Sequence, residues 1–210
     1  MATVGLFLLF IALTDWWDRA LITAYMATFA VIVSVTIGFG IGVLSARSDR
    51  ASRIVLLVCD TLQTFPSFIY LIPVIMLFGV TDTSVLIAVI IYATIPAARY
   101  TIEGPLPLQD LGRMSGANRA QNFFNIELPL ALPHIMLGIN QTVIFALFMV
   151  IIGAMIGTDD LGQYILKALS DKNGIGNGLM LGLCVAFMGL AVDHVIQTWA
   201  RKQREALGIT

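Results

Sequence analysis

The stretch ALITAYMATFAVIVSVTIGFGIGVLSA, residues 20–46, contains no charged residue. The hydrocarbon layer of a bilayer is about 30 Å thick, and about 20 apolar residues of helix cross it. Residues 20–46 are therefore long enough to span a membrane. Because lipid cannot satisfy exposed backbone groups, a span of this kind is expected to be a helix.

The composition extends this conclusion to the whole chain. Hydrophobic residues make up 58% and charged residues 12% of the 210 residues, against roughly 45–50% and 25% in an ordinary soluble domain. Similar uncharged runs occupy residues 1–14, 61–81, 83–98, 128–158 (with His134 near the start) and 173–192. We therefore predict an all-α, polytopic membrane protein whose residues 1–210 form a single transmembrane domain of five core helices and an N-terminal helix.

The first run, residues 1–14, is short for a crossing. It is either a full or partial span that ends at the interfacial pair Trp16 and Trp17, or a leader or start-site artefact. No basic residue precedes it and no small-residue cleavage pattern closes it.

Lysine and arginine favour the cytoplasmic side of short loops, so their distribution predicts the orientation. Placing the loop after residue 46 inside puts nine basic residues in the cytoplasm and three outside. The loop 99–127 and the C-terminal tail are then cytoplasmic. The segment 157–176 is external, and Leu161, Ile165, Leu166 and Leu169 predict a short amphipathic helix along the membrane surface.

Two glycine pairs, Gly38 with Gly42 and Gly178 with Gly182, have the G-x-x-x-G spacing that lets helix backbones approach closely. They indicate either packing within the chain or an interface between subunits.

The cytoplasmic run GANRAQNFFNIELPLALPHI, residues 116–135, contains a glycine followed after nine residues by Ile-x-Leu-Pro. This spacing resembles the EAA signature of permeases of ATP-binding-cassette importers. The resemblance implies a type I importer permease of MetI-like fold, in which a coupling segment, here 103–127, docks on a separate ATPase subunit. Asn118 is expected to cap a helix over 119–125, and Pro129 to lie in the first turn of the next span. The predicted ATPase-coupling residues are Asp110, Gly116, Ala117, Asn118, Arg119, Phe123, Phe124, Ile126, Leu128 and Pro129.

The sequence departs from the signature at one place. Asp110 occupies the acidic position, but Leu111 and Gly112 replace the two small residues that follow it. The linker 101–116 is also about one helical turn shorter than in the related permeases. Either the coupling geometry is altered or the segment has been edited; the alternative reading of 116–129 is a surface helix that only joins two spans.

Residues 60–79 and 128–142 resemble permeases for glycine betaine, proline betaine, choline and related quaternary ammonium solutes, and the resemblance covers roughly residues 20–200. It implies an inner-membrane location, an ATPase dimer, a second permease copy (a homodimer), an external substrate-binding protein and surrounding lipid as partners. Nucleic acid is not expected. The sequence has no G-x-x-x-x-G-K-[ST], G-x-S-x-G or H-E-x-x-H motif, so we expect no enzyme activity and no cofactor.

Polar residues within spans are costly unless they face a partner or a wet path. The predicted translocation path comprises Gln63, Thr64, Pro66, Ser67, Tyr70, Asn140, Gln141 and Thr142; the alternative is that the polar ones bond between helices. Pro66 and Pro73 are expected to bend their helix. Phe65, Phe68 and Tyr70 offer aromatic faces to a quaternary cation.

The remaining polar residues have simpler interpretations. Asp60 and Asp193 are expected at cytoplasmic helix ends, either solvated, paired with arginines or gating. His134 and His194 have no neighbour at metal-ligand spacing and are expected at the interface.

Two other functions stay open at this point. An ion-driven secondary transporter would show repeated halves and a buried acid, neither of which the sequence shows. An assembly or scaffold subunit would keep the coupling helix without a polar path. A permease of the same class for another small solute is a further possibility.

Overall fold

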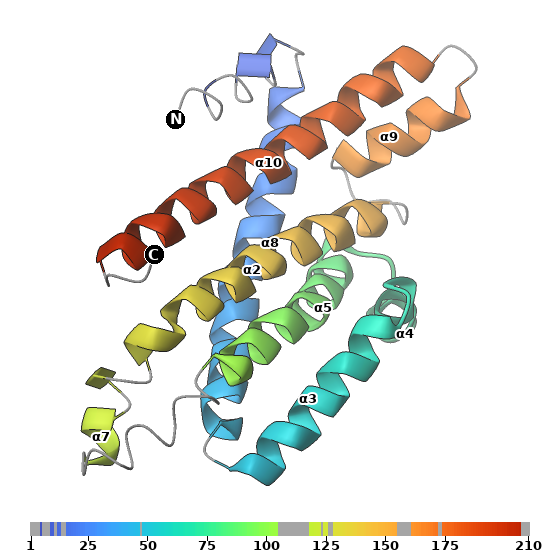
Figure 1. Cartoon of the computed structure of the whole chain (residues 1–210). Helices are drawn as coiled ribbons and strands as arrows, with labels where there is room; N and C mark the ends of the chain where they lie inside the picture. The colour runs from blue at the N-terminus through green and yellow to red at the C-terminus, as the bar shows by residue number, and fades with distance from the viewer. Residues whose placement is uncertain are drawn as a thin grey trace. The chain divides into compact units, whose positions relative to one another are not determined.

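The computed structural model describes residues 5, 9–10, 12–13, 16–46, 48–104, 118–122, 124–125, 128–154, 161–171 and 174–206. Within these residues all regular secondary structure is helical (Figure 1), which confirms the predicted all-α class. The helices are α2 (Trp17–Ser45), α3 (Asp49–Thr64), α4 (Phe68–Phe78), α5 (Asp82–Glu103), α7 (Arg119–Asn122), α8 (Leu128–Ala154), α9 (Leu161–Ser170) and α10 (Ile175–Ala206).

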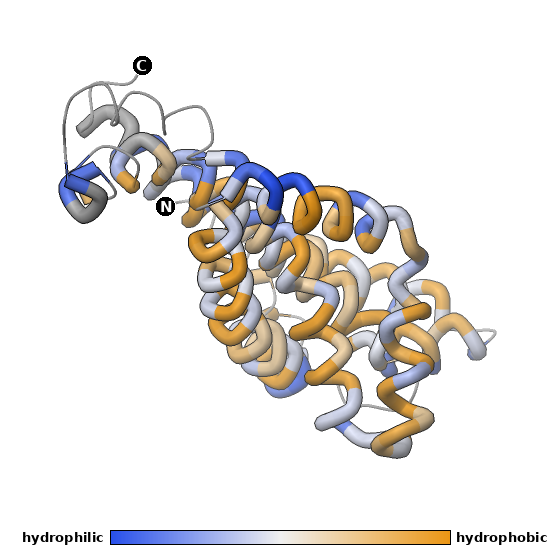
Figure 2. Tube along the Cα trace, turned by 90° about the horizontal axis from the view of Figure 1, so that it is seen from below, coloured by the Kyte–Doolittle hydropathy of each residue, from blue (hydrophilic) through white to orange (hydrophobic). Residues whose placement is uncertain are grey.

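Four of these helices, α2, α5, α8 and α10, are long and apolar enough to cross a membrane. They correspond to the predicted spans at 20–46, 83–98, 128–158 and 173–192, although α5 and α10 continue several residues beyond the predicted ends. Figure 2 shows hydrophobic residues distributed along the helices. Most of residues 1–14 lie outside the described residues, so the N-terminal span stays a prediction.

The predicted span at 61–81 is wrong as a single helix. Helix α3 ends at Thr64, α4 begins at Phe68, and the pair is bent by 89°. Phe65, which precedes Pro66, has extended backbone angles of φ −75° and ψ 137°, because the proline ring disfavours the helical conformation of the residue before it. The bend predicted at Pro66 is confirmed, whereas Pro73 lies within α4 without ending it. Counting α3 and α4 as one broken span gives five in the described chain.

The turn between α4 and α5 is defined by local hydrogen bonds. Gly79 ends α4 with φ of +78°, a left-handed conformation that glycine adopts without steric cost. The Oγ1 of Thr81 accepts a hydrogen bond from the backbone N–H of Ser84 at 3.2 Å and so caps α5. The buried Ser84 hydroxyl in turn donates to the Gly79 carbonyl at 2.7 Å.

The chain divides into two compact units. The first unit comprises residues 1–33, 66–93 and 143–195, and the second comprises 34–65, 94–142 and 196–210. The loop 99–127 and the C-terminal tail, both predicted to be cytoplasmic, belong to the second unit, and the predicted external segment 157–176 belongs to the first. The orientation in the membrane stays a prediction.

The core of the first unit forms where α2, α9 and α10 meet. Its buried residues are Ala20, Leu161, Leu181, Cys184 and Val185. The backbone N–H of Leu161 donates to Thr23 Oγ1 at 3.2 Å and ties α9 to α2. Helices α5 and α8 approach closely at Gly153, where an added Cβ would collide with the Val85 side chain. Glycine at this position therefore permits the contact.

In the second unit α2 packs against α5 through Gly38 and Gly42. A Cβ added at Gly38 would lie 2.5 Å from the Ala97 Cβ, and one at Gly42 would lie 2.5 Å from the Thr101 Cβ. Packing within the chain, one of the two interpretations of this G-x-x-x-G pair, is therefore confirmed. The pair in α10 differs, because a Cβ at Gly182 would meet no described atom within 4 Å.

Candidate functional site

The densest group of charged side chains in the described chain lies in the second unit, where α3 meets α5. Nη1 of Arg99, on α5, forms an ion pair with Asp60 Oδ1 at 3.1 Å and donates a hydrogen bond to Gln63 Oε1 at 2.9 Å; both partners are on α3. Its Nε donates to Glu103 Oε1, one turn further along α5, at 2.9 Å. We call Arg99, Asp60, Gln63 and Glu103 the Arg99 cluster.

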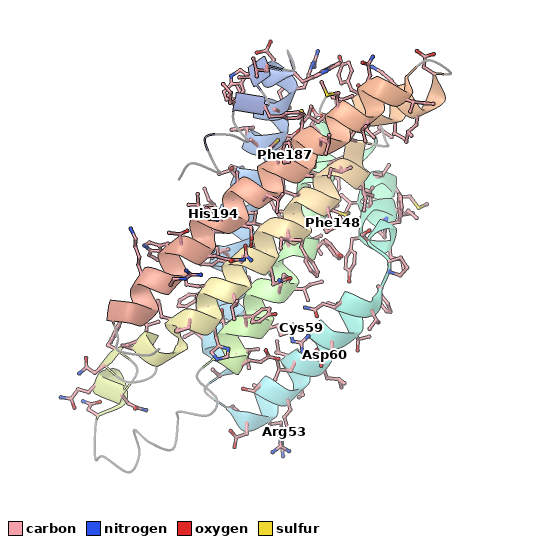
Figure 3. The ribbon with its side chains drawn as sticks, turned by 45° about the horizontal axis from the view of Figure 1, so that its top comes forward. Arg53, Cys59, Asp60, Phe148, Phe187 and His194 are labelled. Carbon is pink, nitrogen blue, oxygen red and sulfur yellow. The ribbon has the colours of Figure 1, made fainter. Side chains whose placement is uncertain are left out.

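The Arg99 cluster is partly open to its surroundings. The side chains of Arg99, Asp60 and Glu103 are 34%, 54% and 35% exposed, so solvent reaches the ion pairs and weakens them. Figure 3 shows Asp60 next to Cys59 on α3, with Arg53 nearer the start of the same helix. Of the predicted roles for Asp60, pairing with an arginine is confirmed.

Gln63, one of the predicted path residues, accepts a hydrogen bond from Arg99 of the neighbouring helix α5. Thr64 differs, because its hydroxyl is exposed and donates to the Thr61 carbonyl of its own helix at 2.7 Å. Pro66 and Ser67 form the break between α3 and α4, where Pro66 is exposed and Ser67 half-buried. The four residues therefore lie together around one helix break.

Tyr70 contributes to an aromatic stack in the first unit. Its ring lies 5.2 Å from that of Tyr92, and Tyr92 stacks on Phe145 at 4.8 Å with an interplanar angle of 25°. Tyr70 is buried, whereas Phe65 and Phe68 are 40% and 43% exposed. The structure thus separates the three aromatic residues that the sequence grouped: one is packed against other rings and two are exposed.

The predicted path residues in α8 occupy neighbouring positions in the second unit. Asn140 and Thr142 are buried, and Gln141 is half-buried. The Thr142 hydroxyl donates to the Gly138 carbonyl of its own helix at 2.8 Å. Such bonds satisfy a buried hydroxyl without a partner helix. Burial of Asn140 and Thr142 agrees with placement inside the bundle, and their role in a path stays a prediction.

The predicted coupling helix over 119–125 is helical at each of its described residues. Helix α7 spans Arg119–Asn122, and residues 124 and 125 are also helical, while residue 123 between them lies outside the described residues. Asn118 precedes it as predicted; its backbone N–H donates to Gln121 Oε1 at 3.1 Å, and its carbonyl accepts the Asn122 N–H at 2.8 Å. Phe124 is 64% exposed, as docking on a partner requires.

Leu128 and Pro129 open α8, which confirms the expected place of this proline in the first turn. The other predicted coupling residues, Asp110, Gly116, Ala117, Phe123 and Ile126, and the side chain of Arg119 lie outside the described residues.

Comparison with known families adds the decisive observation. The model of the family "Binding-protein-dependent transport system inner membrane component" matches residues 38–205, which include both helices of the Arg99 cluster, α7 and α8. The chain belongs to this family.

Three relatives of the membrane component show the range of its similarity. The chain is 65% identical, over 98% of its length, to the trimethylamine N-oxide transport system permease protein TmoV of Pelagibacter ubique, of which it covers 29%. It is 48% identical over 95% to TmoV of Ruegeria pomeroyi, covering 31%. It is 37% identical over 90% to the glycine betaine/proline betaine transport system permease protein ProW of Salmonella typhimurium, covering 54%. The chain therefore spans about a third to a half of these relatives.

The predicted external helix of the membrane component is present as α9. Leu161 is fully buried, and Ile165 packs against the same core. Leu161, Ile165 and Ala168 form the packed side of this helix, and Leu169 is 74% exposed. The place of the helix along the membrane surface stays a prediction. Tyr164 contacts the guanidinium of Arg19 and the ammonium of Lys167 at 5.0 and 4.7 Å from its ring centre, an arrangement typical of the membrane interface.

Arg99 and Glu103 were not predicted as site residues. Both were expected in a cytoplasmic loop after a span ending at residue 98, whereas α5 continues to Glu103. Their i, i+4 spacing on a helix was a signal for the pair. The partners on α3 could not be found in the same way, because Arg99 and Gln63 are 36 residues apart in the sequence.

Proposed function

We propose that this membrane component is the permease subunit, or the permease part of a longer chain, of an ATP-binding-cassette importer for small methylated amines. The similarity to TmoV over 98% of the chain carries the proposal. Similarity to the glycine betaine permease ProW supports the same solute class. The sequence alone favoured glycine betaine or choline, and the identities add trimethylamine N-oxide as the first solute to test.

These solutes share one chemistry. Trimethylamine N-oxide and glycine betaine each combine a methylated, positively charged nitrogen with a negatively charged oxygen. Aromatic faces attract the cationic part, and hydrogen-bond donors or a guanidinium attract the oxygen. The rings of Tyr70 and Tyr92, which lie 5.2 Å apart, and the hydroxyl of Ser67 are proposed as groups of these two kinds. We propose Gln63, Thr64, Ser67, Asn140, Gln141 and Thr142 as polar residues of the path.

Transport in this proposal is driven by separate subunits. An ATPase dimer docks on α7 and the adjoining residues from 110 to 129, a second copy of the permease completes the path, and an external protein delivers the solute. The exposed Phe124 and the place of α7 shortly before α8 in the sequence support the coupling role. We further propose that the C-terminus lies in the cytoplasm, where the basic residues of α10 are expected.

Uptake measurements test the proposal. The permease is expressed with its candidate ATPase and binding protein in a strain without osmolyte uptake, and entry of radiolabelled trimethylamine N-oxide, glycine betaine and choline is followed. We expect vanadate to abolish uptake of at least one of these solutes while an ionophore leaves it largely intact. Ionophore-sensitive, vanadate-resistant uptake would identify a secondary transporter and refute the proposal.

A variant of the coupling segment provides an internal control. Gly116→Val should abolish uptake and separate ATP hydrolysis from transport while membrane insertion stays normal. Normal uptake by this variant would contradict the coupling role of residues 110–129.

A further inference from the structure

Helix α3 is thinly packed for a helix in a membrane protein. Only Ser52 and Cys59 among its residues are buried. Interior packing is what normally fixes the position of a helix. Specific polar contacts of α3 with its neighbours lie near its two ends.

The contact at the start of α3 is buried. The Ser52 hydroxyl donates to the Ser45 carbonyl at the end of α2 at 2.9 Å, and the two residues are 1% and 8% exposed. Breaking a buried hydrogen bond leaves polar groups without water, which makes such bonds persistent. This end of α3 is a fixed point.

The contact near the end of α3 is of another kind. Asp60 and Gln63 lie in its last two turns and bond to Nη1 of Arg99, while Nε of Arg99 bonds to Glu103 of its own helix. The Arg99 guanidinium thus has partners on both α3 and α5. If α3 moves away, Arg99 keeps its ion pair with Glu103, and Asp60, which is 54% exposed, can be hydrated.

Helix α5, which carries Arg99, cannot move away in the same way. Immediately before Arg99, Ala97 and Ala98 face Gly38 of α2, where an added Cβ would lie 2.5 Å from the Ala97 Cβ and 2.8 Å from the Ala98 backbone nitrogen. Close packing of this kind resists sliding. The α2–α5 pair is therefore a platform against which α3 can move.

We propose that the Arg99 cluster is a releasable latch, which holds the end of α3 against α5 in one state of the transport cycle and frees it in another, with the Ser45–Ser52 bond as the pivot. Arg99 acts as a positioning residue, and Glu103 keeps its guanidinium oriented while the latch is open. Because α3 stops at the 65–67 break, its end can swing without straining a continuous helix. The role in a cycle rests on the proposed transport function.

Distance measurements test the latch independently of transport. Ile37 on α2 and Leu57 on α3 are exposed, so spin labels at I37C and L57C, in a Cys59→Ala, Cys184→Ala background, report the separation of α3 from the platform. The purified chain in lipid nanodiscs should give one narrow distance distribution. Arg99→Met should broaden it or add a second, longer distance.

Three further variants keep this measurement decisive. Arg53→Met removes an exposed arginine of α3 itself and should leave the distribution unchanged. The exchange Arg99→Asp with Asp60→Arg should restore the narrow distribution, because the opposite charges again face each other. Arg99→Lys should restore it only in part, since one ammonium cannot reproduce the fork of the guanidinium. An unchanged distribution in Arg99→Met, or no recovery in the charge exchange, would overturn the latch.

The assembled importer tests release during the cycle. The labelled wild type, trapped with vanadate, should populate the longer distance found in Arg99→Met; a trapped state with only the resting distance would overturn the proposal. Arg99→Met should lower the solute carried per ATP roughly three- to tenfold, the order expected from losing one or two partly exposed charged contacts. Absence of uptake by the wild type would refute the proposed transport function. The distances measured in nanodiscs do not depend on uptake, so they would still test the latch.

Discussion

Helices α3 and α5 meet at Arg99, but different contacts hold them in place. Eleven of the 22 residues of α5 are buried, against two of the 16 residues of α3. Helix α5 approaches its neighbours at glycines, with Gly38 and Gly42 on α2 and Gly138 and Gly153 on α8. Helix α3 relies on hydrogen bonds and an ion pair. Close backbone contact fixes a helix permanently, whereas polar contacts at helix ends permit a second position.

The largest effect is expected where the α2–α5 contact is crowded. Gly38→Ala and Gly42→Ala should each lower the free energy of unfolding by about 1–3 kcal/mol, because added methyl groups force the helices apart. Thermal unfolding in detergent measures the loss. Gly40→Ala is the matched control: a Cβ there meets nothing within 4 Å, so its stability should be unchanged or slightly higher. Equal losses of stability at all three positions would contradict the conclusion that close glycine contacts hold α5 in place and do not hold α3.

The next effect concerns the other half of α5, at its contact with α8. Gly153→Ala should be destabilising because the methyl group collides with Val85. Val85→Ala should relieve part of this loss, giving a coupling of about 0.5–3 kcal/mol in a double-mutant cycle. Gly189→Ala, whose Cβ would lie 3.6 Å from Leu147 Cδ1, should be tolerated. Additive effects of Gly153→Ala and Val85→Ala would show that their contact does not position α5.

A smaller effect is expected at the pivot of α3. Ser52→Ala removes the buried hydrogen bond to Ser45 and should cost about 1 kcal/mol. The same thermal measurement applies. Thr61→Ala, which removes an exposed bond to the Leu57 carbonyl of its own helix, should cost less. A pivot variant as stable as Thr61→Ala would show that the start of α3 is no firmer than its end.

The smallest effect is expected at Glu103. Glu103→Gln leaves Arg99 its two contacts on α3, so solute uptake should change by no more than about twofold, as for a partly exposed i, i+4 pair. Combining it with Gln63→Leu should reduce uptake further, because Arg99 then loses an orienting partner on each helix. If Glu103→Gln alone abolishes uptake, Glu103 has a role beyond orienting Arg99.

Much of the candidate site could be read from the sequence because its signals are local. Pro66 indicates the helix break, Asn118 indicates the start of α7, and Pro129 indicates the first turn of α8. Gln63 and Asp60 were identified as polar residues that need a partner. Thr142 was placed between two alternatives, and the structure shows a third in the bond to its own helix. The prediction of one helix over residues 61–81 was wrong because a hydropathy profile records how many residues are apolar and carries no information on the direction of the helix axis.

The sequence by itself determined the class of the protein and its apolar helices, because hydropathy, caps and prolines act within a few residues. Only the tertiary structure decided which glycine pair is crowded: Gly38 with Gly42 and Gly178 with Gly182 share one spacing, yet of the two only the first pair lies too close to another helix for an added Cβ. It also decided that Arg99 contacts Gln63 of α3, which lies 36 residues earlier in the sequence. Such pairings depend on how helices pack, and packing is set by the whole bundle.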